Sequence, residues 1–118
     1  MPRLRARIDE LARIGATEAG GSCRLALTDE DRQGRDLVCQ WMADLGMTVT
    51  IDAIGNVFGV WETGDGLPVM TGSHIDTVRT GGIYDGNYGV LAGLEVIETC
   101  QSAGITPSRP LAVAIFTD

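Results

Sequence analysis

The fold is decided by residues 67–116, which read LPVMTGSHIDTVRTGGIYDGNYGVLAGLEVIETCQSAGITPSRPLAVAIF. An apolar run at 67–71 is followed by a glycine-rich loop, by apolar residues at helical spacing, and by a second apolar run at 111–116. Strand, helix and strand in this order form a β-α-β unit, whose two strands run parallel in one sheet. The stretch therefore predicts an α/β fold in which both strands end at the same edge.

The rest of the chain extends this unit into a layered sheet with flanking helices. Thr28, followed by three acidic residues, is typical of a helix N-terminus. Periodicity predicts strands near 47–53, 57–61, 67–72 and 110–117, and helices near 3–14, 29–45 and 88–103. We expect the 67–71 run to be buried and the 111–116 run to be covered on both faces. Residues 1–118 then form one unit with no internal domain boundary.

Composition excludes several classes of function. Nine Arg against sixteen Asp and Glu give a net charge of −7, which argues against binding to nucleic acid or to an anionic membrane surface. The absence of Lys excludes a Walker-type phosphate loop and a Schiff-base mechanism within this stretch. Three widely spaced Cys, a charged amphipathic beginning and no apolar run of membrane-spanning length indicate a reduced, cytoplasmic setting.

Chemistry concentrates in the loop between the two apolar runs. His74, the only histidine, follows the end of the first run, and Asp76 lies two residues further on. In extended backbone these side chains share a side, so Asp76 could accept a hydrogen bond from an imidazole that binds a metal. Asp85 follows in the glycine-rich segment before the helix. Open α/β sheets place their sites at this edge. A lone histidine is nevertheless more often a polar loop residue, and Asp85–Gly86 is also ordinary turn chemistry.

Several motifs here resemble one known family. They are GSHIDT (72–77), GGIYDG (81–86), LAGLEV (91–96) and AIFTD (114–118), with LTDEDR (27–32) and DAIGNVFG (52–59) upstream. They are similar to the zinc-dependent aminoacylase and carboxypeptidase-like metallohydrolases. Within these, the motifs most resemble the amidase/hydantoinase/carbamoylase branch, which holds N-carbamoyl-L-amino acid hydrolase, β-ureidopropionase and allantoate amidohydrolase.

The resemblance implies the amino-terminal part of a di-zinc, peptidase-like catalytic domain. His74 would bind one divalent ion, Asp85 would bridge two, and Asp76 would be the catalytic-site residue that orients His74. The two ions would be Zn, or Mn, Co or Ni. The family places a Glu-Glu pair directly after the F-T-D strand and two further histidines later, whereas this sequence ends at Asp118. We therefore expect residues 1–118 alone to be inactive.

The implied function is hydrolysis of non-peptide C–N bonds in small N-carbamoyl amino acids, ureido acids or allantoate, by an enzyme that is a homodimer when complete. Two alternatives remain: an aminopeptidase or N-deacylase of the same superfamily, and a non-catalytic structural or binding remnant. The geometric expectations are more specific. The side chains of His74 and Asp85 should lie within about 8 Å of each other. Asp118 should lie near His74. The family resemblance further suggests an unusual peptide bond after Asp85, for which a cis bond is one form.

Overall fold

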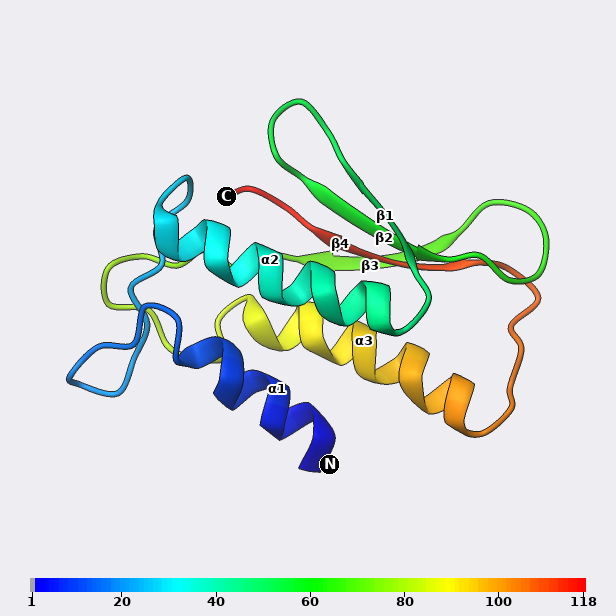
Figure 1. Cartoon of the computed structure of the whole chain (residues 1–118), viewed down its shortest axis with the longest axis horizontal. Coiled ribbons are helices and arrows are strands. Elements are labelled where there is room, and N and C mark those ends of the chain that lie inside the picture. Colours follow the sequence, from blue (N-terminus) through cyan, green and yellow to red (C-terminus); the bar gives the residue numbers. More distant parts are fainter. Residues whose placement is uncertain (1) are drawn as a thin grey trace.

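The computed structural model describes residues 2–118 (Figure 1). In chain order the elements are α1 (Pro2–Ala12), α2 (Asp29–Asp44), β1 (Thr48–Ile51), β2 (Val57–Trp61), β3 (Val69–Ser73), α3 (Asn87–Ser102) and β4 (Leu111–Ile115). Every helix and strand expected from the sequence is present, with ends shifted by a residue or two. Within residues 2–118, no helix is both long enough and apolar enough to cross a membrane.

The strands form one mixed sheet in the order β1-β2-β4-β3. Strands β3 and β4 pair in parallel, which confirms the predicted β-α-β unit, while β1 with β2 and β2 with β4 are antiparallel. In the parallel pair Ser73 lies opposite Ile115, and the Phe116 amide donates to the Ser73 carbonyl at 2.7 Å. The segments that begin at His74 and at Phe116 therefore leave the sheet side by side.

Two helix ends follow from local chemistry. The Thr28 hydroxyl caps α2 by accepting a hydrogen bond from the Asp31 amide at 3.2 Å, as the sequence predicts. Beyond the C-terminal end of α2, Gly46 has a φ of 74°, a conformation that glycine adopts without the steric cost of a side chain. These ends fix the length of α2 and bring the chain directly into β1.

Helices α2 and α3 lie over one face of the sheet, and α1 packs against α3 (Figure 1). Odd-numbered strand positions face them: a Cβ at Gly59 would meet Met42 of α2, and one at Gly93 of α3 would meet Val113. Apolar side chains from all three helices, two strands and the loops merge into one buried cluster of Leu4, Ile8, Leu11, Val38, Met42, Met47, Val57, Ile75, Val90, Leu91, Leu94, Ile97, Val113 and Ile115. The fold is thus two layers around one core, consistent with the predicted α/β class.

The burial expected for the 67–71 run is wrong, whereas the burial expected for the 111–116 run is confirmed for β4. Strand β3 is an edge strand, and its Val69 and Met70 are 50% and 49% exposed, because β4 is its only neighbour in the sheet. Strand β4 is buried on both faces from Ala112 to Ile115, as expected, although helices lie over only one of these faces. An apolar run alone does not distinguish an edge strand from a central one.

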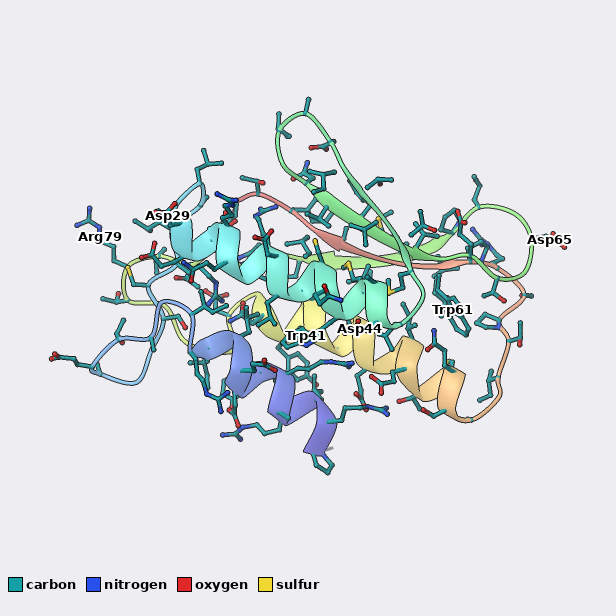
Figure 2. The ribbon with its side chains drawn as sticks, in the orientation of Figure 1. Asp29, Trp41, Asp44, Trp61, Asp65 and Arg79 are labelled. Carbon is teal, nitrogen blue, oxygen red and sulfur yellow. The ribbon has the colours of Figure 1, made fainter. Side chains whose placement is uncertain are left out.

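Charged residues attach α1 to α3. Arg3 contacts Glu95 at 2.9 Å and Glu98 at 3.1 Å, and Arg7 contacts Glu98 as well. The hydrogen bond from Arg3 lowers the pKa of the Glu95 carboxyl, against the opposing effect of partial burial. The Arg7 guanidinium also lies 5.8 Å from the centre of the Trp41 ring, which projects from α2 toward these helices (Figure 2). This cluster joins the three helices at a distance from the loops that follow β3 and β4.

Candidate metal centre

The His74 side chain is held in one tautomer. Its Nδ1 lies 2.8 Å from the backbone carbonyl oxygen of Asp76. A carbonyl can only accept a hydrogen bond, so Nδ1 carries a proton, and in the neutral ring Nε2 carries the free lone pair. An imidazole fixed in this way is ready to bind a metal ion through Nε2.

Asp85 faces that free nitrogen. Its Oδ1 lies 3.9 Å from His74 Nε2, well within the 8 Å limit set from the sequence. Two zinc ligands at bond lengths of about 2.0–2.1 Å and tetrahedral angles lie roughly 3.3 Å apart. The Asp85 side chain is 67% exposed, so a small rotation would close the difference. The pair can therefore ligate one ion without rebuilding either loop.

Gly86 allows this approach. Its φ is 72°, and a Cβ there would lie 2.3 Å from the His74 carbonyl oxygen and 2.7 Å from Nδ1. The expectation of a cis peptide bond after Asp85 is wrong, since residues 2–118 contain no cis peptide bond. The left-handed conformation of Gly86 makes the sharp turn instead and starts α3 beside His74.

Asp76 and Asp118 complete the polar cluster. Asp76 is 4% exposed, and its Oδ2 accepts a hydrogen bond from the Asp118 amide at 3.0 Å, while Oδ1 lies 3.6 Å from His74 Nδ1. Burial raises the pKa of the Asp76 carboxyl, and the Asp118 hydrogen bond and His74 oppose that rise. Asp76 thus holds the imidazole through its carbonyl rather than its carboxylate, because the chain is no longer a strand after Ser73. One ligand atom each of His74, Asp76 and Asp118 lie within 4.8 Å of one another.

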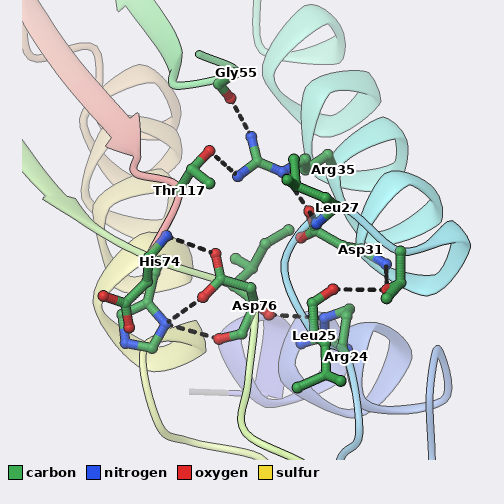
Figure 3. A network of polar contacts seen from close by, with 12 residues as sticks. Arg24, Leu25, Leu27, Asp31, Arg35, Gly55, His74, Asp76 and Thr117 are labelled. Carbon is green, nitrogen blue, oxygen red and sulfur yellow. Dashed lines mark hydrogen bonds and ion pairs between the residues drawn. The ribbon is translucent and has the colours of Figure 1, made fainter.

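Arg35 of α2 holds the end of β4 at this cluster (Figure 3). Its guanidinium contacts Asp31 at 3.1 Å, the Gly55 carbonyl, and the Thr117 hydroxyl at 2.9 Å. Thr117 precedes Asp118, so the contact from α2 fixes the backbone that bonds to Asp76.

An open recess of about 520 Å³ is lined by His74, Asp76, Asp85 and Asp118, together with Leu25, Ala26, Thr77 and Val78. One imidazole nitrogen and several carboxylate oxygens form a donor set that suits Zn, Mn, Co or Ni. The tautomer of His74 and its distance from Asp85 both fit an ion bound between them. The residues present therefore fit a divalent metal ion, and their individual roles remain a proposal.

Sequence reasoning missed the residues that support this cluster, chiefly Arg24 and Asn87. Both are fully buried, and the Arg24 guanidinium donates to the Asn87 side chain at 2.9 Å. One feature of the sequence could have indicated a buried, hydrogen-bonded role for Arg24. It is the only charged residue between Glu18 and Asp29, and its neighbours are Cys23 and Leu25. A charge in such a setting is typically exposed unless hydrogen bonds hold it.

Comparison with known proteins shows which proteins this chain resembles. No family model matches the chain. An N-carbamoyl-L-amino acid amidohydrolase from Geobacillus stearothermophilus is 42% identical over 98% of this chain. A solved hydantoinase/carbamoylase family amidase from Burkholderia ambifaria is 52% identical over 98% of the chain, with a TM-score of 0.95. The chain is thus homologous to C–N amidohydrolases of the hydantoinase/carbamoylase type, and it spans 29% of the length of each of these two proteins.

A more distant likeness concerns the fold alone. The aminopeptidase PepT from Bacillus cereus is 17% identical over 97% of the chain, with a TM-score of 0.76. The two-layer arrangement is therefore shared with a peptidase, as the sequence resemblance implied.

Proposed function

We propose that this chain forms part of the catalytic domain of a metal-dependent amidohydrolase that cleaves non-peptide C–N bonds in N-carbamoyl or ureido acids. The observation that carries the proposal is the pairing of His74 Nε2 with the Asp85 carboxylate at 3.9 Å, in a chain 42% identical to an N-carbamoyl-L-amino acid amidohydrolase. His74 and Asp85 are the proposed ligands, and Asp85 is the proposed bridge between two ions. Asp76 is the proposed residue that orients His74.

The chemistry of each residue follows from its contacts. A bound divalent ion lowers the pKa of a water molecule and polarises a carbonyl group. His74 offers Nε2 because the Asp76 carbonyl holds the proton on Nδ1. Asp85 is exposed enough to reach a shared position, and Asp118 places a further carboxylate beside the recess. Buried Asp76 keeps the loops after β3 and β4 together through the Asp118 amide.

The alternatives find less support. The aminopeptidase, at 17% identity, shares the fold alone, whereas the amidase of the hydantoinase/carbamoylase family is 52% identical. A structural or binding remnant would not require a histidine held in the ligating tautomer. The proposal also includes zinc as one suitable ion, a homodimer as the complete enzyme, and a cytoplasmic setting, all of which rest on the resemblance and the composition.

A segment exchange tests the proposal. The aligned segment of the Geobacillus amidohydrolase would be replaced by residues of this chain, and hydrolysis of N-carbamoyl-L-amino acids would be followed with Zn, Mn or Co. We expect metal-dependent turnover, and a loss of about a hundredfold or more in kcat/KM when His74→Ala is introduced into the exchanged protein.

Asp65→Asn is the matched control for Asp85→Asn in that exchanged protein. Asp65 is an exposed carboxylate in the loop between β2 and β3, at the far end of the molecule from the recess (Figure 2). It should leave turnover unchanged, whereas Asp85→Asn should reduce it strongly. A folded exchanged protein that binds metal and yet turns over equally well with and without the His74→Ala substitution would contradict the proposal.

A further inference from the structure

Arg24 lies beneath both loops of the candidate metal centre. It is 0% exposed and sits in the segment between α1 and α2. Its Nε donates to the Ile75 carbonyl at 2.7 Å, and its Nη2 donates to Asn87 Oδ1 at 2.9 Å. Ile75 lies between His74 and Asp76, and Asn87 lies two residues after Asp85. One planar guanidinium therefore joins the loop that carries His74 to the helix start that carries Asp85.

The remaining contacts of Arg24 anchor this link in the fold. Its Nη1 donates to the carbonyls of Leu11 and Ile14 at the end of α1, at 3.1 and 2.7 Å. Its backbone amide donates to the Thr77 hydroxyl at 2.7 Å, and its carbonyl accepts from the Thr77 amide at 2.6 Å. The His74 loop is thus held by both the backbone and the side chain of Arg24.

We infer that Arg24 is a positioning residue that sets the separation of His74 and Asp85, an inference that rests on the proposed function. The four guanidinium hydrogen bonds within residues 2–118 all go to neutral oxygen atoms. A buried cation without a carboxylate in direct contact is costly, and a well-packed apolar side chain is often the more stable choice. Stability alone therefore does not explain an arginine at this buried position. A rigid, planar guanidinium that hydrogen-bonds to two loops at once does explain it.

Gly34 is a second observation that supports a positioning role for Arg24. It lies inside α2, where glycine is a poor helix former. A Cβ at Gly34 would lie 3.1 Å from Arg24 Cδ and 3.4 Å from Ile75 Cδ1. The glycine makes room for the Arg24 side chain against the His74 loop, so Gly34→Ala is a mild way to displace it without removing any hydrogen-bonding group.

The test measures Zn²⁺ affinity of the 118-residue chain by competition with a chromophoric chelator, for Arg24→Lys, Asn87→Ala and Gly34→Ala. Each should weaken Zn²⁺ binding, by roughly tenfold or more for the first two, the range typical of groups that orient metal ligands. Because His74 is the only histidine, its ¹⁵N signals can also be read without metal. In the same variants, the ¹⁵N chemical shifts of metal-free His74 should differ from those of the unaltered chain.

Arg3→Gln is the control, because Arg3 bonds α1 to α3 far from the loops. It should lower the melting temperature while leaving Zn²⁺ affinity within about twofold. The inference is overturned if the Arg24 and Asn87 variants lower the melting temperature but change neither Zn²⁺ affinity nor the His74 signals. If Arg24→Lys does not fold, the Zn²⁺ affinity and His74 signals of Gly34→Ala and Asn87→Ala decide whether the inference holds. If the unaltered chain binds no measurable Zn²⁺, the metal-free His74 signals alone decide the inference, and the segment exchange decides the proposed function.

Discussion

A polypeptide of residues 1–118 supplied with Zn, Mn or Co should not hydrolyse N-carbamoyl amino acids, ureidopropionate or allantoate above the metal-ion background. It contains a single histidine, and the described carboxylates at the recess are Asp76, Asp85 and Asp118. Asp76 is already occupied by the Asp118 amide. A two-metal site needs several ligands for each ion and an open position for water.

The expected rate is at least about 10⁴-fold below that of the Geobacillus relative under the same conditions, because the recess has too few ligands for two ions and general acid–base catalysis alone contributes roughly 10²–10⁴-fold. The assay compares the two proteins at equal concentration and metal content. Turnover that depends on metal and disappears with His74→Ala would show instead that these residues assemble a working site by themselves.

Replacing Gly86 with alanine should damage both the metal centre and the fold. The residue has a φ of 72°, and its new Cβ would lie 2.3 Å from the His74 carbonyl oxygen and 2.6 Å from the imidazole Cε1. Relief of that overlap requires His74 and residue 86 to move apart, which changes the separation of His74 from Asp85. We expect Zn²⁺ affinity to fall by roughly 10–100-fold, and the free energy of unfolding to fall by about 2 kcal/mol.

Gly82→Ala is the matched control in the same loop. A Cβ at Gly82 has no heavy atom within 4 Å. This substitution should leave Zn²⁺ affinity and the urea unfolding midpoint close to those of the unaltered chain. Equal effects of the two substitutions would mean that loop flexibility, rather than the contact between residue 86 and His74, sets the metal affinity.

The sequence predicted the elements because local signals and tertiary packing agree. Leu4, Ile8 and Leu11 recur at helical spacing and are buried, and Thr28 caps α2 as expected. Edge position carries no such signal, so the exposure of Val69 and Met70 on β3 could not be foreseen from an apolar run. Which strand lies at an edge depends on pairings between distant segments.

The candidate site could be predicted from the sequence only in part, because some of its contacts depend on distant segments. The positions of His74 and Asp85 follow from two parallel strands and a glycine-rich return loop, and the structure brings them together. The sequence predicts that the Asp76 carboxylate accepts the hydrogen bond from His74, whereas its backbone carbonyl does so, which depends on how the chain turns after Ser73. The role of Arg24 depends on contacts over 51 and 63 residues of sequence, beyond the reach of local patterns.

The most direct test of a metal centre at His74 is ¹⁵N NMR of its imidazole during a Zn²⁺ titration at about pH 8, above the usual pKa of an imidazole. The chain has one histidine, so the two ring nitrogens give unambiguous signals. We predict a proton on Nδ1 before metal is added, a shift of the Nε2 signal on Zn²⁺ binding, and a much weaker response in Asp85→Asn. A proton on Nε2, with no change of that signal as Zn²⁺ is added, would contradict the account.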